Sequence, residues 1–300
     1  MMMKYTIFIP NLFTMFGLYM FVILFLMHDA FAEYPSPTPK GALSVYQSFG
    51  FGQWSQYRAR GDAESTPNPI QTIVSQSSVG YGVAQNFDLE LTLPVLHSMF
   101  GDQDPVSGIG FMQVASKISV VQEGDAPITL SIKPAIRIGT LHAEQRGELH
   151  NIGEGTIDFG VGLALGRLEY VGLGFYWFDM GARYWHRIPA SFDLSAPPAP
   201  DVTFDVNIGY SFHPSFGLSG TIEGIQRLGG QDFPTTVDQS IDQWAALHVT
   251  QVKAGGRASY YATEKLTIDL IALRSVFAIN NPIDELYFGI GINYFQPPSR

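Results

Sequence analysis

The segment that decides the fold runs from Asp201 to Glu223 and reads DVTFDVNIGYSFHPSFGLSGTIE. Because side chains alternate between the two faces of an extended strand, the apolar residues at every second position from Val202 to Phe212 share one face. A His-Pro dipeptide at 213–214 interrupts this run, and the alternation restarts after it. The pattern predicts a β-hairpin with a very short turn, one apolar face and one polar face that carries charges.

The same alternation recurs along the chain. The segments FDLELTLPV (87–95), ITLSIKPAIRIG (128–139) and LYFGIGINY (286–294) place apolar residues at nearly every second position. Residues typical of turns separate these segments, and the whole pattern predicts about twelve strands. The expected strands are 41–58, 71–84, 87–96, 110–122, 128–139, 157–168, 171–185, 202–212, 215–228, 245–261, 265–277 and 285–295.

The connections between the expected strands alternate in length. Long connections are polar and rich in Pro, Gly, Asp and Asn, and a short connection follows each of the first five. Outer-membrane barrels show this asymmetry, with long outward loops, short periplasmic turns and both termini periplasmic when the strand number is even. The sequence therefore predicts an all-β fold, a transmembrane antiparallel up-and-down β-barrel with both termini on the periplasmic side. The long connections are expected at 59–70, 97–109, 140–156, 186–201, 229–244 and 278–284, and the short ones at 85–86, 122–127, 169–170, 213–214 and 262–264.

The first residues have the features of an export signal. Lys4 precedes an apolar region at 12–27, and a small-residue cleavage site, AFA at 30–32, precedes Glu33. The alternative is an uncleaved membrane anchor, although no later segment approaches the roughly 18 apolar residues of a membrane helix. The expected organisation is a signal peptide at 1–32, a short Pro-rich lead at 33–40, the barrel at 41–295 and a C-terminal tail at 296–300, in the outer membrane of a Gram-negative cell.

Composition narrows the function. The chain has 300 residues, a formal net charge of −10 and no cysteine. The negative charge argues against nucleic acid as a partner, since that needs a basic surface. Without cysteine there is no disulfide, thiolate zinc site or lipoprotein anchor. We expect no metal, no cofactor and no catalytic residue, because the histidines that could serve as a base near the outer leaflet have no evident Ser or Asp partner. These histidines are His97, His142, His150, His186 and His248.

Charged residues on the polar faces are expected to line the lumen. Acidic and basic strands are neighbours, so cross-strand pairs can offset the cost of burying each charge. Two interpretations remain open, structural ion pairs in a narrow polar lumen or a selectivity constriction. The expected lumen charges are Asp88, Glu90, Lys117, Lys133, Arg137, Asp205, Glu223, Lys253, Arg257 and Asp269.

A sector of the wall with few side chains is expected in the strands at 157–168 and 171–185. Inward positions there are mostly glycine, and an apolar patch follows toward the outer mouth. Glycine in a strand often marks the close approach of another group, so the sector is either a path for an apolar solute or a space filled by a loop. Pro134 cannot donate a hydrogen bond to the ladder, so it should kink its own strand, the one expected at 128–139 beside this sector. The expected path consists of Gly160, Gly162, Gly172, Gly174, Tyr176, Phe178 and Met180.

Basic side chains are also expected at the outer rim, where the barrel contacts outer-membrane lipid. Arg183, His186 and Arg187 flank Trp185 at the end of one expected strand. Because guanidinium groups pair well with phosphate, these residues are candidates to bind lipopolysaccharide phosphate.

Several strands also carry a family resemblance. The segments VGYGVAQNFDLELTLPV (79–95), GIGFMQVASKISV (108–120), GEGTIDFGVGLALG (153–166) and LYFGIGINYF (286–295) resemble the recurrent strands of the MetA-pathway of phenol degradation family of outer-membrane proteins. The resemblance implies an outer-membrane barrel that passes small hydrophobic or aromatic molecules by diffusion. The chain departs from the pattern in its tail QPPSR, because many such barrels end on the aromatic residue that the barrel-assembly machinery recognises. The alternatives are a lipid-modifying enzyme and a sealed structural or adhesive barrel.

Overall fold

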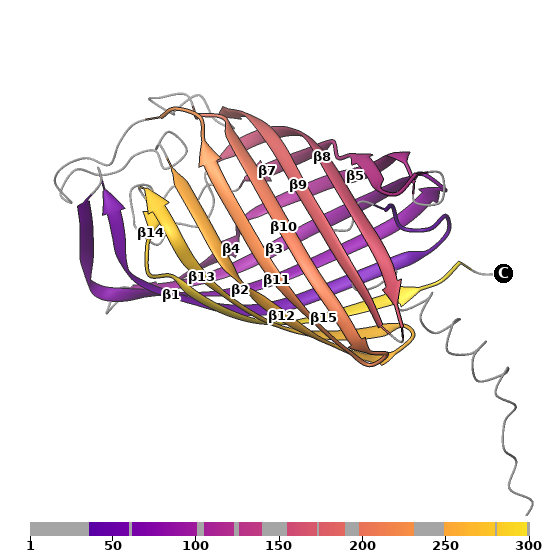
Figure 1. Ribbon diagram of the computed structural model, residues 1–300. Helices are drawn as coiled ribbons and strands as arrows, with labels where there is room; N and C mark the ends of the chain where they lie inside the picture. Colours follow the sequence, from indigo (N-terminus) through magenta and orange to yellow (C-terminus); the bar gives the residue numbers. More distant parts are fainter. Residues whose placement is uncertain are drawn as a thin grey trace, which may run out of the picture.

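The computed structural model describes residues 36–59, 62–100, 105–122, 126–139, 155–172, 174–189, 198–230, 249–279 and 281–298. Within these ranges the chain forms one antiparallel sheet that closes on itself (Figure 1). The strands are β1 (Leu43–Ala59), β2 (Asp62–Ala84), β3 (Phe87–Phe100), β4 (Val106–Ile109), β5 (Phe111–Val121), β6 (Thr129–Ile132), β7 (Ala135–Gly139), β8 (Thr156–Val171), β9 (Gly174–Pro189), β10 (Asp201–His213), β11 (Phe216–Arg227), β12 (Thr250–Thr263), β13 (Leu266–Ile279), β14 (Asn281–Pro282) and β15 (Leu286–Gln296).

These strands make twelve spans of the barrel wall, which confirms the predicted fold. Each of the pairs β4/β5, β6/β7 and β14/β15 continues one span across a short interruption. The interruption between β6 and β7 falls at Pro134, where a kink was expected because proline has no N–H for the ladder. The carbonyl of Pro134 still accepts the N–H of Ser116 at 3.0 Å, so the wall stays closed there.

The first and last spans close the barrel. β1 pairs with β2 on one side and with β15 on the other, from Leu43↔Gln296 to Gln53↔Leu286. The C-terminus therefore lies at the same end as the start of β1, which is also the end with the short turns (Figure 1). We call this the short-turn end and the opposite one the long-connection end.

The first long connection differs from the prediction. A loop was expected at 59–70, but β2 begins at Asp62 and pairs with β1 as far as Ala59↔Asp62. A strand that extends beyond the apolar band has water on both faces and needs no apolar alternation, so its polar sequence resembles a loop.

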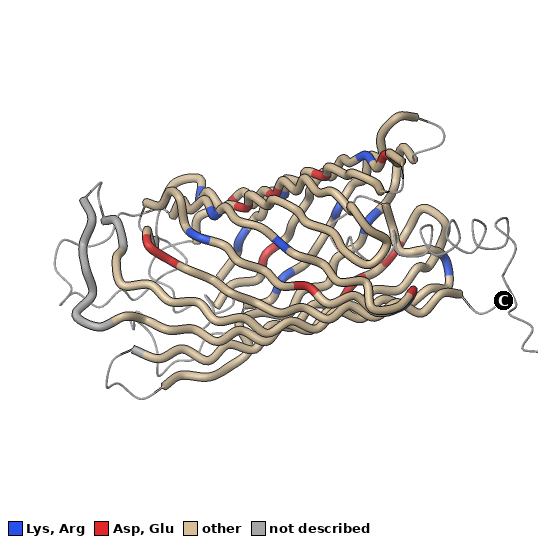
Figure 2. The backbone as a smooth tube through the Cα atoms, turned by 60° about the horizontal axis from the view of Figure 1, so that its bottom comes forward, with Lys and Arg blue, Asp and Glu red and all other residues tan. Residues whose placement is uncertain are grey.

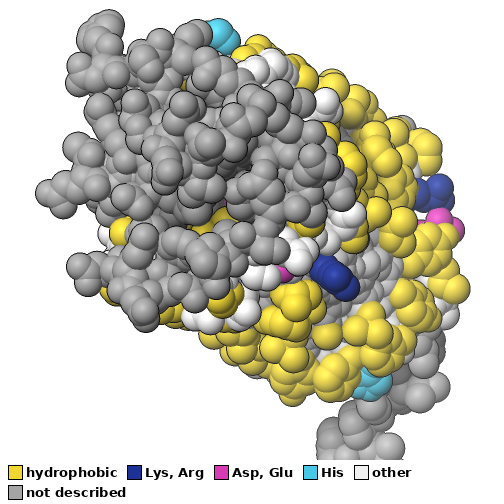
Figure 3. All heavy atoms as spheres, turned by 90° about the vertical axis from the view of Figure 1, so that its left-hand side faces the viewer, with side chains coloured by type: hydrophobic (Ala, Val, Ile, Leu, Met, Phe, Trp, Pro, Cys, Tyr) yellow, Lys and Arg dark blue, Asp and Glu magenta, His cyan; other side chains and the backbone are white. Residues whose placement is uncertain are grey.

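Apolar side chains cover the outer surface of the barrel. Ile208, Leu270 and Val276 are among the most exposed, and in Figure 3 apolar side chains cover most of the barrel surface visible beside the grey atoms. Aromatic residues gather on this surface toward the short-turn end, where the Phe216 and Tyr260 rings lie 5.1 Å apart. An apolar band with an aromatic belt is the outer surface that a bilayer requires of a barrel. The described residues contain no helix that is long and apolar enough to cross a membrane.

Inward aromatic side chains explain much of the glycine in the wall. The space that a Cβ at Gly209 would need is taken by the indole of Trp177, and Tyr287 covers Gly50 in the same way. Each large ring thus lies flat against a neighbouring strand instead of pointing across the lumen. The glycines make room for rings, and the rings form part of the inner wall.

Candidate functional site

The lumen holds the ten charged residues that the sequence assigned to it. Their positions alternate with apolar residues of the outer surface, and their side chains are buried or half-buried. Three neighbouring strands contribute no charge, since β15, residues 43–57 of β1 and residues 65–84 of β2 contain no Asp, Glu, Lys or Arg. Figure 2 shows the charged positions gathered on the remaining strands. The lumen therefore has a neutral sector and a charged sector.

Asp88 organises the charged groups near the short-turn end. Its side chain is 2% exposed, and its Oδ1 accepts the backbone N–H of Lys117 at 2.9 Å. A small cavity of about 40 Å³ lies beside it, and Glu90, Lys117, Lys133 and Arg183 help to line that cavity. Acidic and basic groups are mixed in this part of the lumen.

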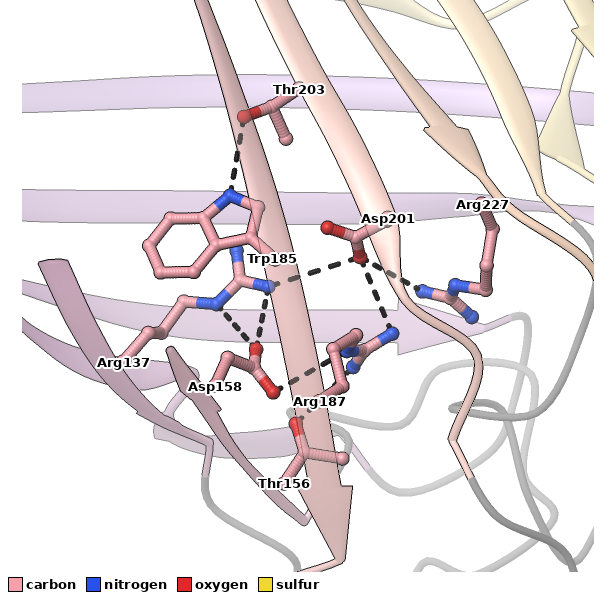
Figure 4. A network of polar contacts seen from close by, with 8 residues as sticks. All are labelled: Arg137, Thr156, Asp158, Trp185, Arg187, Asp201, Thr203 and Arg227. Atoms are coloured by element: carbon pink, nitrogen blue, oxygen red, sulfur yellow. Dashed lines mark hydrogen bonds and ion pairs between the residues drawn. The ribbon is translucent and has the colours of Figure 1, made fainter. Parts of the chain in front are cut away.

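A network of three arginines and two aspartates lies near the long-connection end (Figure 4). Asp158 pairs with the Arg137 guanidinium at 2.7 Å and with Arg187 Nε at 3.4 Å. Asp201 lies 3.4 Å from Arg187 Nη1 and 3.9 Å from Arg227 Nη2. The five residues come from five consecutive spans, so the network ties β7, β8, β9, β10 and β11 together.

Trp185 fills the space next to this network. The Arg137 guanidinium lies 4.4 Å from the centre of its ring, and the indole Nε1 donates to Thr203 Oγ1 at 3.2 Å. The ring covers Gly160 and packs with Ala115 and Ala135. Tryptophan, arginines and aspartates together occupy the lumen side of β7–β9 near the long-connection end.

The predicted solute path is wrong in its second half. Tyr176 and Met180 are 40% and 41% exposed on the outer surface, and Phe178 shares their face opposite Ile208. The ladder β8–β9 runs without a bulge from Thr156↔Pro189 to Val171↔Gly174, so it pairs even-numbered with odd-numbered residues. Paired residues point to the same side of a sheet. The residues that face the lumen therefore have even numbers in β8 but odd numbers in β9.

The glycines of the expected path do not leave an open wall either. Gly160 and Gly162 face inward, but Trp185 occupies the space above Gly160, and the Arg183 side chain lies against Gly162. Gly172 lies in the turn, with a φ of 64° that favours glycine. Gly174 begins β9, and the carbonyl of Ser211 lies where its Cβ would be.

The change of parity brings residues into the lumen that the sequence reasoning missed. Trp177, Asp179, Arg183 and Arg187 are inward residues of β9, so Arg183 and Arg187, the candidates for binding lipopolysaccharide phosphate, point into the lumen. The segment WFDMGARYWHR (177–187) contains the signal, because its charges all fall on one face and apolar residues dominate the other. Asp201 was missed because it was assigned to the end of the long connection at 186–201, whereas Arg227 lay within the expected strand 215–228 but was not included among the lumen charges.

The hollow half of the lumen lies along β9–β12. A cavity of about 420 Å³ is lined mostly by polar side chains, with two large rings, Trp177 and Phe204, and Ile225. Asp205, Glu223 and Lys253 are direct neighbours in one row across β10, β11 and β12. Lys253 also pairs with Glu285 at 2.7 Å. The lining residues with side chains are Trp177, Asp179, Thr203, Phe204, Asp205, Asn207, Ser219, Thr221, Glu223, Ile225, Gln251, Lys253, Arg257 and Ser259.

Hydrogen bonds order the polar wall of this cavity. Asn207 donates to Asp179 at 2.8 Å and accepts from Thr221 at 2.8 Å, which links three neighbouring strands. On the opposite side, Ser259 donates to the buried Asp269 at 2.6 Å. A solute in the cavity would meet carboxylates, hydroxyls and amides held in fixed positions.

One of the histidines does have a hydroxyl partner. His97 Nδ1 lies 2.5 Å from Ser107 Oγ across the β3–β4 ladder, whereas no such partner was expected. A nucleophile–base pair also needs a third group that orients the base. Within the described residues, no hydrogen bond joins the other ring nitrogen of His97 to such a third group.

Comparison with known proteins supports the fold. No family model and no curated protein matches the sequence. Among solved structures, the chain is similar to an outer membrane channel from Pseudomonas putida F1, with a TM-score of 0.68, 14% identity, and coverage of 88% of this chain and 98% of that one. It is also similar to the NanC porin, with a TM-score of 0.51, 10% identity, and coverage of 83% and 98%. The fold is that of bacterial outer-membrane barrels.

Proposed function

We propose that the protein is a passive channel that lets small polar solutes diffuse through the outer membrane. The cavity of about 420 Å³ along β9–β12 carries this proposal, because it leaves room for a solute inside a barrel whose outer surface suits lipid. The likeness to a channel and to a porin supports it at the level of fold. The resemblance to the phenol-degradation group also points to passive diffusion, but of small hydrophobic or aromatic molecules.

The chemistry of the cavity favours polar solutes over purely apolar ones. The apolar patch of Tyr176, Phe178 and Met180 faces outward, so it does not offer a solute an apolar route through the lumen. Trp177, Phe204 and Ile225 supply apolar surface, and the other lining side chains carry hydroxyl, amide or charged groups. A solute with a small ring and polar substituents fits this lining, and aromatic compounds of that kind remain within the proposal.

The lining also favours solutes with a positive charge. Three carboxylates, those of Asp179, Asp205 and Glu223, line the cavity with two basic side chains, and one of these, Lys253, is paired with Glu285. Rings of carboxylates in a pore attract cations. We therefore expect the channel to conduct cations better than anions.

Planar-bilayer recordings test the proposal. Ser219 lines the cavity, whereas its neighbour Leu218 is 56% exposed on the outer surface. We expect stepwise conductance from the refolded protein, a smaller step for Ser219→Trp and an unchanged step for the control Leu218→Trp. In a KCl gradient, the reversal potential should have the sign of cation preference. A folded barrel without conductance would refute the channel, and equal steps for the two tryptophan variants would refute this route.

A further inference from the structure

The segment before the first strand folds back into the barrel. Residues 39–42 form a tight turn, in which the N–H of Ala42 donates to the carbonyl of Pro39 at 2.9 Å. Gly41 has a φ of 78° in this turn, a conformation that glycine adopts without steric cost. The turn reverses the chain at the start of β1, so that the preceding residues lie against the wall instead of leading away from it.

This segment packs against two inward glycines of β2, Gly80 and Gly82. The carbonyl of Pro39 lies where a Cβ at Gly82 would be, and the side chains of Ser44 and Thr38 are the nearest to Gly80. The N–H of Gly41 donates to the carbonyl of Gly82 at 2.7 Å, and the N–H of Gly82 donates to Ala42 at 3.0 Å. The segment is thus hydrogen-bonded to the inner side of the wall, at positions where a larger side chain would displace it.

Asp88 holds the free end of the segment. Its Oδ2 accepts the backbone N–H of Thr38 at 2.7 Å, while its Oδ1 accepts the N–H of Lys117. A hydrogen bond to an ionised carboxylate is about twice as strong as one between neutral groups. One buried carboxylate therefore fastens the segment to both β3 and β5.

We propose that residues 36–42 form a constriction at the short-turn end that limits the size of the solutes the channel passes. This inference rests on the proposed channel function and adds the element that sets its size limit. A layer on the inner face of a sheet takes up about 10 Å of the lumen. Because a twelve-strand barrel is narrow, such a layer removes a large share of its cross-section. Residues 36–40 of the expected Pro-rich lead are then part of the pore and not a mere linker to the barrel.

Single-channel recordings of two variants test the constriction. We expect deletion of residues 33–40 to raise the conductance step roughly twofold, because a layer of about 10 Å is removed from the lumen. Asp88→Asn should loosen the segment and increase brief openings to the larger step. Asp269→Asn is the matched control, since Asp269 is also buried in the lumen but bonds to Ser259. Gel mobility with and without heating shows whether each variant folds.

A labelled cysteine separates a constriction from a structural latch. The chain has no cysteine, so Thr38→Cys gives a thiol reagent one target. A bulky maleimide at position 38 should reduce conductance, whereas the same reagent on Leu89→Cys, at the lipid surface, should not.

The outcomes keep the two proposals apart. Wild-type conductance reports the channel, and the difference between wild type and the deletion reports the constriction. A silent wild type with a conducting deletion would support the constriction and refute an open channel. Equal currents in wild type and deletion, including zero in both, would overturn the constriction. So would a label at position 38 that leaves the current unchanged.

Discussion

Replacing Asp158 with asparagine should cost the barrel more stability than any change to a surface ion pair. Asp158 is 1% exposed and pairs with Arg137 and Arg187. Without its charge, three guanidinium groups would share Asp201 as the remaining carboxylate of the network. Breaking a buried ion pair on one side costs about 3–5 kcal/mol. The Arg137 side chain keeps 18% exposure to the lumen, so we reduce the expected loss to about 2–3 kcal/mol.

The assay is urea unfolding of the refolded barrel in lipid vesicles. With a slope of about 3 kcal/mol per molar urea, the expected loss lowers the midpoint by roughly 1 M. Glu169→Gln is the control, since Glu169 lies on the same strand and pairs with Arg167 at 2.8 Å, but both side chains are at least 40% exposed. Its expected effect is below about 0.5 kcal/mol, because water screens an exposed pair.

A double-mutant cycle with Arg187→Gln isolates the pair. We expect a coupling energy of about 1 kcal/mol or more, because the two residues contact each other and share one network. Equal midpoints for Asp158→Asn and Glu169→Gln, or a coupling energy near zero, would refute the idea that the network is a rigid, buried support.

Three further predictions concern the lumen and its rim. The double variant Asp205→Asn/Glu223→Gln should move the reversal potential in a KCl gradient toward zero, since it removes two carboxylates of the cavity; an unchanged potential would place the selectivity elsewhere. Trp185→Ala should enlarge the conductance step and destabilise the barrel by about 3–5 kcal/mol, whereas Tyr184→Ala on the outer surface should leave the step unchanged. Partial burial by itself would raise the pKa of Asp284, but hydrogen bonds from Ser55 and Gln56 hold this pKa below its ordinary value. Because the pKa of Asp284 is lower in the folded protein, the ionised carboxylate stabilises the fold above its ordinary pKa. This stabilisation is lost as pH falls through the folded pKa. Asp284→Asn should therefore narrow the difference between the urea midpoints of unfolding at neutral and at acid pH.

The fold was predictable because the bilayer imposes a period-two pattern on every span. Strands such as β3, β10 and β15 show that pattern without exception for most of their length, and the alternation of connection lengths fixed the barrel. The twelve spans of the described residues follow the predicted segments closely. The strand bounds differ where spans continue into the expected long connections, as β2 does from Asp62 and as β3 does to Phe100.

The phase of β9 was not predicted because it depends on a local detail of the turn. The ladders β2–β3, β5–β6, β10–β11 and β12–β13 each contain a bulge beside their short turn, and the bulge keeps the inward parity unchanged from one strand to the next. The β8–β9 ladder has none, so the parity switches. The prediction assumed that β8 and β9 keep the same inward parity, as the other hairpins do, and it therefore placed Tyr176 and Met180 in the lumen instead of on the outer surface. The charged residues Asp179, Arg183 and Arg187 could have shown the correct phase of β9, because they share one face and charged side chains face the lumen.

The predicted lumen charges fall into groups that no single strand reveals. Which carboxylate meets which guanidinium depends on the register of neighbouring spans, and the sequence does not give that register until the phase of β9 is known. The inward fold of residues 36–42 was missed for a different reason. A Pro-Lys-Gly sequence at 39–41 is compatible with a turn, but nothing in it shows that Gly80 and Gly82 receive the segment.

The distribution of charge across the lumen links stability to transport. In the described residues, the network near the long-connection end holds three arginines against two aspartates, and the cavity along β9–β12 is lined by more carboxylates than basic groups. This difference in charge favours a cation near Asp205 and Glu223 over one near the arginine-rich network. The network can thus be closely packed without obstructing the solute. Its excess of arginines repels a cation, and the carboxylates of the cavity along β9–β12 attract that cation. Reversing that charge difference with Asp205→Lys should invert the ion preference, while the network, whose residues are unchanged, keeps the barrel folded.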